Sequence, residues 1–383
     1  QWAEIYLKAV QTSSLFAFPS GFYTSFSFIY LPIMKSVIVK AHPLRCEIID
    51  TLIPQPEPDE VLIKVIFCAS NPRDWKAPDH LIHGIEINQG NEMSGIIEAV
   101  GNNVYEFRKG DRVAAAHPMQ TENGTYAEYA TAPVNTCFLL PPNISFEEAS
   151  TIPFALCTAA IGLYQRLKIP FPTSPEIAQV QPPLIVYGGG SSIGAFTLKL
   201  ARFGHFEKVI AVCGSGRSYI ESLGVVTDFV DYRNCNVVND LKAALGGKKC
   251  FHAVDAINDS NSFRHLSEVL APEGARMSVY LPRLDYSDIP PWISIGITFF
   301  GTVHGQATPI SNEVYSEDVD FAYAFFRLVG RWIAEGKMNG QPHEVLPRGL
   351  ESVEEGLRML KEGKVSAKKL IYRVSDTPGV GSA

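Results

Sequence analysis

Paired cysteines, an excess of basic residues, and repeats or low-complexity tracts are all missing from this 383-residue chain. Its seven cysteines are scattered and never spaced C-x-x-C, which argues against a disulfide framework or a clustered zinc site and favours a reducing, cytoplasmic location. Lys and Arg number 33 against 40 Asp and Glu, and the resulting net charge of −7 offers little attraction for a phosphate backbone. Nucleic acid is therefore not expected as a ligand.

Hydrophobic residues make up 46% of the chain and charged residues 19%, a balance typical of ordered globular proteins. At ~100–200 residues per domain, the length predicts two or three domains with a sizeable core. A soluble, enzyme-like protein is the class that remains.

Residues 12–34 form an aromatic, apolar stretch with almost no charge, as a membrane segment would. Pro19, Gly21 and Pro32 interrupt this stretch and no basic cluster precedes it, so no membrane-spanning helix is expected. We treat residues 1–33 as an N-terminal extension of unassigned function, and we expect the fold to start with a strand at 35–40.

Two patterns of predicted secondary structure follow one another along the chain. Residues 34 to about 142 are rich in predicted strands, at 61–66, 95–101 and 126–130, which indicates a β-rich domain. From residue 184, short apolar strands alternate with helix-length segments, and the strands are expected at 184–187, 209–213, 228–231, 253–256 and 276–281. That alternation is typical of an α/β fold with a parallel sheet covered on both faces. Helices are expected at 318–335 and 352–362, and a last strand at 369–374 is assigned back to the first domain.

A glycine-rich turn follows the strand at 184–187. It reads Gly188, Gly189, Gly190, Ser191, Ser192, Ile193 and Gly194, and a helical stretch comes next. Glycines allow a ligand to approach the backbone closely, and a helix N-terminus attracts an anion. The spacing is not a clean G-x-G-x-x-G, because Ile193 stands where a third glycine is expected, and Gly194 is the alternative helix-packing glycine. In this context the turn predicts binding of a dinucleotide diphosphate.

The end of the second strand lacks the acid that an NAD site usually carries for the ribose 2′-hydroxyl. The segment 212–217 offers Ser215 and Arg217 instead, which suit a 2′-phosphate, so NADPH is predicted over NADH. A solvated loop in which Arg217 begins the next helix is the alternative interpretation.

Several short motifs occur in a specific order. They are Asn71-Pro72-Arg73-Asp74, Gly95 to Gly101, Gly110-Asp111-Arg112-Val113, Gly124 with Tyr126-Ala127-Glu128-Tyr129, Pro153 with Thr158-Ala159-Ala160, and the glycine turn. In these motifs the chain resembles the medium-chain dehydrogenase/reductase superfamily. It is most similar to the zinc-free quinone oxidoreductase and trans-enoyl reductase branch, including fungal members labelled GroES-like or zinc-type alcohol dehydrogenases.

The resemblance implies a Rossmann doubly wound parallel sheet at 156–305 and a GroES-like, β-rich catalytic domain built from 34–155 and 306–375. It places the active site in the cleft between these domains and leaves 376–383 as a tail. The stretch 293–303 either pairs Rossmann sheets across a homodimer or is buried within one chain.

The resemblance also addresses metal binding. Zinc-dependent relatives have a ligating Cys where this chain has Asn71 and a ligating His where it has Asn91, and side-chain amides are poor substitutes for those ligands. The four-cysteine lobe of those relatives is missing between residues 113 and 126. No metal is therefore predicted, and we interpret His117 and Glu92 as packed or hydrogen-bonded residues.

A reaction without a metal must place little charge on the substrate or stabilise it with other donors. Hydride transfer to a quinone, or to the β-carbon of an α,β-unsaturated carbonyl compound, fits that limit. Asn71 is the first candidate for a polar catalytic group, because the resemblance puts it beside the nicotinamide; a turn residue before Pro72 is the alternative. His80 is a candidate proton donor, with an exposed loop histidine or protonation by solvent as the alternatives.

Further cofactor contacts are implied by the resemblance alone. Thr158 is expected to open the helix that faces the nicotinamide; Ser191, Ser192 and Ile193 to lie on the phosphates; Tyr232 to lie near the adenosine half or in the core; Ala256, Ile257 and Leu281 to lie at the carboxyl ends of later strands; and Lys368 to approach the diphosphate or to be a surface lysine.

Three functions stay open at this point. The first is an NADPH-dependent reductase of free small molecules, and the second is an accessory trans-enoyl reductase that partners a polyketide or fatty synthase. The third is a non-catalytic nucleotide sensor or RNA-binding protein on the same fold. A zinc-type alcohol dehydrogenase is disfavoured by Asn71 and Asn91.

Overall fold

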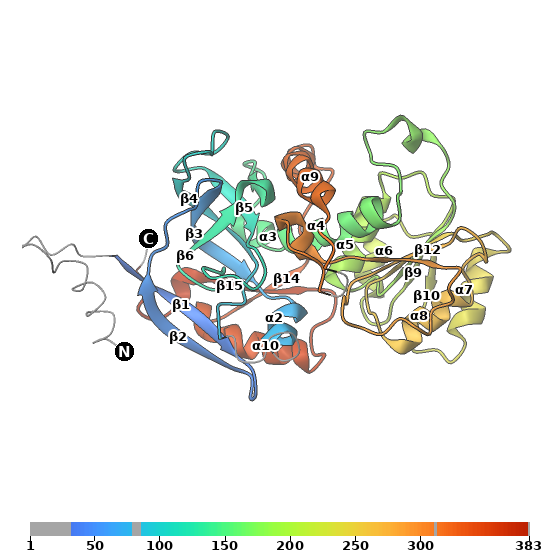
Figure 1. The fold of residues 1–383 in the computed structure, drawn as a ribbon. Coiled ribbons are helices and arrows are strands. Elements are labelled where there is room, and N and C mark those ends of the chain that lie inside the picture. Colours follow the sequence, from blue (N-terminus) through green and yellow to red (C-terminus); the bar gives the residue numbers. More distant parts are fainter. Residues whose placement is uncertain (1–31, 79–85, 310–311, 382–383) are drawn as a thin grey trace, which may run out of the picture. The chain divides into compact units, whose positions relative to one another are not determined.

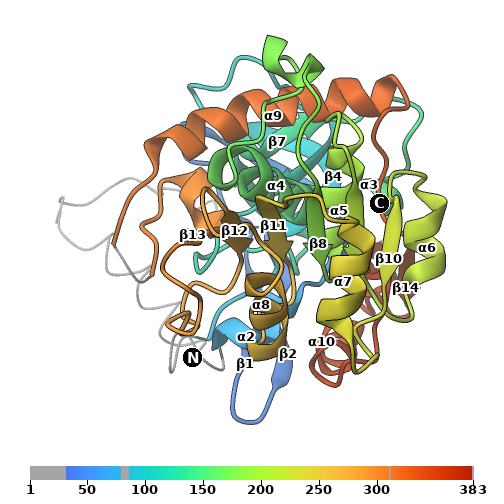
Figure 2. The same ribbon diagram turned by 90° about the vertical axis from the view of Figure 1, so that its right-hand side faces the viewer.

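A computed structural model describes residues 32–78, 86–309 and 312–381, and the fold lies in the unit Ile33–Ala383. Its first part is a six-stranded, wholly parallel sheet (Figures 1 and 2). The strands stand in the order β10-β9-β8-β11-β12-β13, so the order reverses between β8 and β11. Their bounds are β8 Leu184–Tyr187, β9 Val209–Val212, β10 Asp228–Val230, β11 His252–Asp255, β12 Arg276–Val279 and β13 Ser294–Ile297. The predicted doubly wound α/β fold is confirmed.

Helices cover both faces of this sheet because its strands are apolar on both sides. In β8, Leu184 and Val186 pack toward α5, whereas Ile185 and Tyr187 pack toward α7 and α8. Figure 2 shows α7 and α8 in front of the sheet and α5 behind it. The helices are α5 Ser192–Ala201, α6 Arg217–Ser222, α7 Val237–Leu245 and α8 Ser260–Ser267.

Strand β13 was not predicted as a strand. It pairs with β12 from within the same chain, and the following 3₁₀ helix η5 (Phe300–His304) is largely buried. The interpretation of 293–303 as a segment buried within one chain therefore holds for residues 293 and 298–303. The homodimer stays a prediction.

The second part is β-rich and uses both ends of the chain. Its seven-stranded sheet has the order β14-β15-β3-β4-β5-β7, with β6 paired to β3, and β1 and β2 form a separate antiparallel pair. The strand β15 runs antiparallel to β3, so the last strand lies in the same sheet as the strands of the N-terminal β-rich segment. The bounds are β1 Ile33–Lys40, β2 Arg45–Leu52, β3 Glu60–Ala69, β4 Glu92–Val100, β5 Arg112–Ala116, β6 Tyr129–Pro133, β7 Cys137–Leu139, β14 His343–Leu346 and β15 Lys369–Arg373.

Two strands of this part begin at other residues than predicted. β4 starts at Glu92, not at Gly95, because Gly95 lies inside the strand where β3 approaches closely: a Cβ there would lie 2.1 Å from the Lys64 carbonyl oxygen. The segment 126–130 is not one strand, and β6 begins at Tyr129. The Tyr126 N–H donates to the Asn88 side chain at 3.1 Å, so a tertiary contact prevails over local strand propensity.

The remaining helices lie mostly in or beside the β-rich part. The two predicted C-terminal helices are present as α9 and α10, shifted by one or two residues. The elements are α2 Pro72–Lys76, α3 Phe146–Ala149, α4 Pro153–Ala160, α9 Ser316–Ala334, α10 Val353–Lys361, the π-helical η3 Ile161–Arg166, and the 3₁₀ turns η2 Val134–Thr136, η4 Pro175–Ala178, η6 Gly349–Ser352 and η7 Val374–Asp376.

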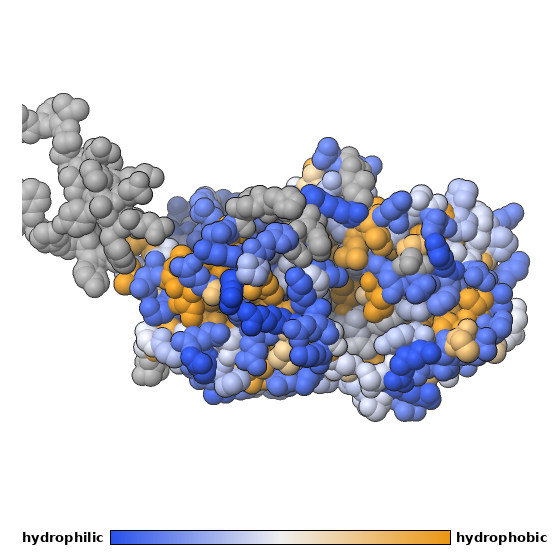
Figure 3. All heavy atoms as spheres, turned by 90° about the horizontal axis from the view of Figure 1, so that it is seen from below, coloured by the Kyte–Doolittle hydropathy of each residue, from blue (hydrophilic) through white to orange (hydrophobic). Residues whose placement is uncertain are grey.

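The two parts share a core. Helix α4 packs against α5, and one buried cluster joins side chains of α4, α5 and α9 with those of β5 and β7. Figure 1 shows α4 and α9 between the two sheets. In Figure 3, hydrophobic residues reach the surface in several groups interrupted by hydrophilic ones. Within the described ranges, no helix is both long enough and apolar enough to cross a bilayer.

Candidate active site

The predicted cofactor residues gather at one edge of the parallel sheet. The glycine turn follows β8, and the loops after β9, β10, β11 and β12 carry the other candidates. Parallel strands end at the same edge, and ligands of such sheets bind outside the carboxyl ends where the strand order reverses. The candidates brought to this edge are Ser215 and Arg217 after β9, Tyr232 after β10, Ala256 and Ile257 after β11, and Leu281 after β12.

Glycines are required at two positions of the turn. Gly188 has φ +80°, and a Cβ there would lie 2.6 Å from the Ile257 side chain. A Cβ at Gly194 would lie 2.2 Å from the Gly188 carbonyl oxygen, so Gly194 is the helix-packing glycine and the alternative spacing is correct. A Cβ added at Gly190 would have only the Gly216 Cα within 4 Å, at 3.6 Å. The backbone at Gly190 is therefore accessible to a ligand.

Helix α5 begins directly after the turn. The Ser191 hydroxyl caps it by accepting from the Gly194 N–H at 3.0 Å. The N–H groups of Ser192 and Ile193 lie in the first turn, where a helix has no carbonyl for them, so they suit an anion. A diphosphate fits this cradle.

The loop after β9 and the end of β10 provide the groups expected at the adenosine end. The Arg217 guanidinium lies 4.8 Å from the Phe229 ring centre, which fixes its direction. Tyr232 is 52% exposed and lies against Gly214, so it is not a core residue. Arg217 is also the first residue of α6. The backbone therefore matches the alternative interpretation in which Arg217 begins the next helix.

Three other predictions concern the walls of this edge. Ile257 is 43% exposed beside Gly188, and the Leu281 carbonyl accepts from the Tyr286 hydroxyl at 3.0 Å. Lys368 forms an exposed ion pair with Glu344, and its approach to a diphosphate stays a prediction.

Thr158 does not open a helix, contrary to the prediction. Helix α4 begins at Pro153, and Thr158 lies five residues further on, buried, with its hydroxyl donating to the Phe154 carbonyl at 2.6 Å. Proline at the first helical position explains the earlier start, since its missing N–H is not needed there. Whether Thr158 touches the cofactor stays a prediction.

Asn71 lies in a buried polar cluster with Glu92 and Lys369. Its side-chain Nδ2 donates to Glu92 Oε1 at 2.7 Å, and its Oδ1 accepts from the Lys369 Nζ at 2.8 Å. Lys369 and Glu92 also form a direct ion pair, and both side chains are at most 1% exposed. A carboxylate needs a donor and an ammonium needs an acceptor, so these two charges fix the orientation of the Asn71 amide.

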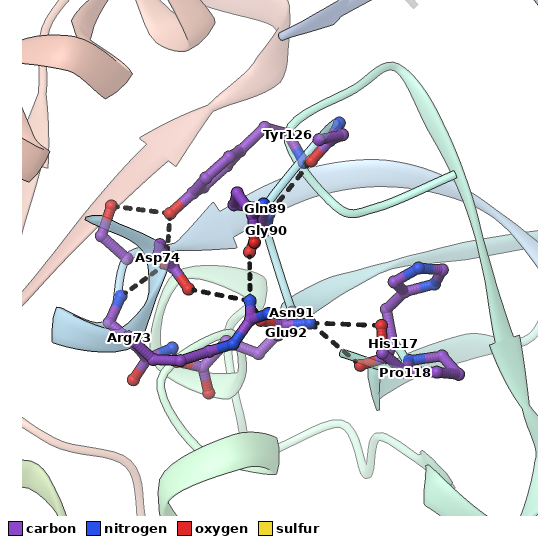
Figure 4. Close-up of polar contacts among 12 residues, drawn as sticks. Arg73, Asp74, Gln89, Gly90, Asn91, Glu92, His117, Pro118 and Tyr126 are labelled. Atoms are coloured by element: carbon purple, nitrogen blue, oxygen red, sulfur yellow. Dashed lines mark hydrogen bonds and ion pairs between the residues drawn. The ribbon is translucent and has the colours of Figure 1, made fainter. Parts of the chain in front are cut away.

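The local backbone around Asn71 is held by Asp74. Asp74 Oδ2 accepts from the Asn71 N–H at 2.8 Å. It also accepts from the Tyr126 hydroxyl at 2.6 Å (Figure 4). Burial raises the pKa of Asp74 to about 6, although Arg73 and the Tyr126 hydroxyl act in the opposite direction. Asn71 therefore comes from a rigid turn at the start of α2.

Arg73 and Asn91 form a second buried group (Figure 4). Arg73 Nη1 donates to the Gln89 carbonyl at 3.1 Å and to Asn91 Oδ1, while Asn91 Nδ2 donates to the His117 carbonyl at 3.2 Å. The His117 ring lies 2.7 Å from the Thr131 carbonyl, and burial lowers its pKa to about 4. His117 is thus packed and hydrogen-bonded, as predicted.

These clusters do not fit zinc. Asn71 and Asn91, at the positions that resemble zinc-ligand positions, both use their amides in hydrogen bonds, and the ammonium of Lys369 already lies against Asn71 and Glu92. A second cation beside that ammonium would be repelled. Among the residues with described positions, no three His, Cys, Asp or Glu side chains cluster as a metal site would require.

Glu92 is packed and hydrogen-bonded, as predicted, whereas its buried ion pair with Lys369 was not predicted from the sequence. A lysine at the start of a strand is ordinarily exposed, and its partner Asn71 lies 298 residues away. The predicted proton donor His80 lies outside the described residues.

Comparisons with known proteins agree with this geometry. Residues 57–142 match the model of the alcohol dehydrogenase GroES-like domain. The chain is 35% identical over 320 residues to trans-enoyl reductase fsr4 of Gibberella fujikuroi, covering 82% of this chain and 91% of that protein. It is 27% identical over 352 residues to trans-enoyl reductase iccB of Talaromyces variabilis, covering 85% and 92%. The crystal structure of CurK enoyl reductase matches with a TM-score of 0.70 at 18% identity, over 88% of this chain and 98% of that one, which shows the shared fold.

Members of this superfamily act with a nicotinamide cofactor, and the cradle formed by the glycine turn and α5 fits its diphosphate. The chain is therefore a reductase that belongs to the trans-enoyl reductase family, in the zinc-free branch of the medium-chain dehydrogenase/reductase superfamily.

Proposed function

We propose that this chain reduces the C=C bond of α,β-unsaturated carbonyl compounds with NADPH and without a metal ion. The observation that carries the proposal is the buried lysine: the Lys369 ammonium lies against Glu92 and against Asn71, the residue that stands where zinc-dependent relatives have a ligating Cys. The cluster therefore offers fixed N–H donors instead of a Lewis acid.

The chain's residues divide the work of binding and orientation. The turn at 188–190 and the first turn of α5 bind the diphosphate. Ser215 and Arg217 bind the 2′-phosphate, which makes NADPH the preferred cofactor. When bound, the reduced nicotinamide supplies the hydride for the β-carbon of the substrate.

Asn71 has one amide hydrogen left for the substrate. Its Nδ2 carries two hydrogens, and Glu92 accepts one of them. The second is the group that we propose for the substrate carbonyl oxygen, where negative charge develops. Because Lys369 and Glu92 hold the amide, it needs no reorientation during the reaction.

The proton for the α-carbon needs a separate donor. Histidine side chains as a class can donate a proton near neutral pH, so His80 remains our proposed donor. Solvent is the alternative source. His80→Ala tests the choice: a large loss of kcat supports His80, and an unchanged kcat supports solvent.

An enoyl reductase acting in trans is the more specific form of this function. The relatives fsr4 and iccB are both named trans-enoyl reductases, which supports a role for this chain as the partner of a polyketide or fatty synthase. Turnover of carrier-bound enoyl chains at least tenfold faster than of free enoyl thioesters is expected in that case.

A cofactor and substrate panel tests the proposal. NADPH and NADH are each titrated and then tested for turnover with an enoyl thioester, a quinone and an alcohol, with and without a chelator. We expect NADPH to be consumed with the enoyl thioester and the chelator to have no effect. Preference for NADH would overturn the assignment of NADPH as the cofactor. Alcohol oxidation that the chelator abolishes would overturn the assignment of metal-free C=C reduction.

The role of Asn71 has its own test with a matched control. Removal of one donor to a developing oxyanion typically lowers kcat about 10²-fold or more, so we expect that loss for Asn71→Ala with little change in the Kd of NADPH. Asn143→Ala is the control, since Asn143 donates to the Ile333 carbonyl at 3.0 Å, away from this cluster. Equal kcat values for the two variants would remove Asn71 from the mechanism.

A further inference from the structure

A short segment that leads into β15 joins the cluster of Asn71, Glu92 and Lys369 to the loop that follows β9. Lys369, the first residue of β15, donates to Asn71. Three residues earlier, the Ser366 Oγ lies 2.9 Å from the Ser215 Oγ, in the loop that follows β9. Residues 366–369 therefore reach from the β-rich part to the loop in which 2′-phosphate recognition is predicted.

The backbone of this segment is fitted closely to the Rossmann part. A Cβ added at Gly216 would lie 3.1 Å from the Ala367 Cβ and 3.3 Å from the Gly190 Cα. Ala367 itself has φ +51°, a left-handed conformation that a residue with a side chain rarely adopts. Such a conformation persists where surrounding contacts enforce it and is concentrated at functional positions. The contact of Ser366 with Ser215 is thus set by the backbone.

The groups around the two hydroxyls suit a phosphate. Ser215 and Ser366 share one hydrogen bond, which leaves one hydroxyl hydrogen and the option for both hydroxyls to turn toward an anion. Arg217 adds a positive charge held over the Phe229 ring. A guanidinium with two hydroxyls is the donor set that a phosphate monoester prefers.

One acid lies near this loop, and its charge is compensated. Asp231 follows β10 and forms an ion pair with Arg233, whose Nη2 is 2.5 Å from Asp231 Oδ2. Arg233 and, to a smaller extent, Arg217 hold the pKa of Asp231 down at about 2. The negative charge of Asp231 is therefore paired with Arg233 and does not stand unpaired near the loop.

We propose that Ser366 is a further cofactor-binding residue, which binds the 2′-phosphate of NADPH together with Ser215 and Arg217 and thereby determines cofactor specificity. The inference rests on the proposed use of NADPH. It goes beyond that proposal by taking one phosphate ligand from the opposite part of the chain. The same segment carries Lys369, so a bound 2′-phosphate also fixes the backbone that positions Asn71.

Binding titrations of Ser366→Ala test this role. The dissociation constants of NADPH, NADH, 2′,5′-ADP and 5′-AMP are measured for the wild type and the variant. Loss of one hydrogen bond to a charged group weakens binding about tenfold, so NADPH and 2′,5′-ADP should each bind about tenfold more weakly. NADH and 5′-AMP lack the 2′-phosphate and should change less than twofold.

Two further variants control for structural effects. Ser366→Thr keeps the hydroxyl and should retain most of the affinity for NADPH. Ser222→Ala removes an exposed serine hydroxyl at the far end of α6, which donates to the Tyr219 carbonyl, and should leave all four constants unchanged.

The outcomes separate the two proposals. A wild type that binds NADH as tightly as NADPH overturns both NADPH use and the role of Ser366. A wild type that prefers NADPH, with Ser366→Ala unchanged within twofold or equally weakened for NADH, overturns the role of Ser366 and leaves NADPH use intact.

Discussion

Replacing Lys369 by methionine removes the positive charge from the buried cluster of Asn71, Glu92 and Lys369. Methionine fills a similar volume but leaves Glu92 buried without a positive partner, although the Asn71 amide and the Phe154 N–H (3.1 Å) still donate to the carboxylate. Loss of one partner from a buried ion pair costs about 3–5 kcal/mol, because the remaining charge stays desolvated. We therefore expect Lys369→Met to lower the free energy of unfolding by about that amount.

A double-mutant cycle separates the ion pair from the loss of packing. Glu92→Gln should also destabilise the protein, since it leaves the ammonium without its carboxylate. The double variant removes both charges, and its loss should be smaller than the sum of the two single losses by about 2–3 kcal/mol. Urea unfolding of all four proteins without cofactor measures this coupling. Single losses under about 1 kcal/mol, or strictly additive losses, would refute the ion pair.

Three other perturbations give independent tests. Gly194→Ala should destabilise the protein by about 1–3 kcal/mol and weaken cofactor binding, because its Cβ would lie 2.2 Å from the Gly188 carbonyl, whereas Gly190→Ala, with 3.6 Å of space, should leave urea stability unchanged. Tyr126→Phe removes the 2.6 Å hydrogen bond to a buried carboxylate and should cost about 1–3 kcal/mol in urea unfolding; a loss below about 0.5 kcal/mol would show that the bond contributes nothing. His117 has a pKa lowered to about 4 by burial, so its unfolded form takes up a proton near pH 6.5 and stability is lost as the pH falls toward 4. From pH 7 to pH 5 the wild type should lose about 2 kcal/mol more than His117→Asn, and equal pH slopes of the two proteins would show that His117 is not held neutral.

Local sequence patterns predict the parallel sheet and the glycine turn well. The apolar strand Leu184–Tyr187 has the predicted bounds, because buried parallel strands read as continuous apolar runs. The cradle is readable for the same reason: the strand, the glycines and the helix follow one another within about a dozen residues. The last strand is also predictable, since the alternating series leaves it without a partner.

The buried cluster of Asn71, Glu92 and Lys369 could not be predicted in the same way. Lys369 meets Asn71 across 298 residues and Glu92 across 277, and no local period encodes such contacts. A lone lysine or serine is ordinarily a surface residue, so neither the buried ion pair of Lys369 nor the contact of Ser366 with Ser215 could be read from the sequence. The misplaced start of β6 has a similar cause, since the contact of Tyr126 with Asn88 outweighs local strand propensity. The start of α4 differs, because the proline at its first position is a local signal.

Transfer of an isotope label from the cofactor distinguishes metal-free alkene reduction from zinc-dependent carbonyl reduction. Chelator-treated protein is incubated with an enoyl thioester and NADPH that carries deuterium at both C4 positions of the nicotinamide, and the product is examined by mass spectrometry and NMR. We expect one deuterium at the β-carbon and a rate equal to that of untreated protein. Deuterium on a carbinol carbon, or turnover that returns only when zinc is added back, would instead show zinc-dependent carbonyl reduction.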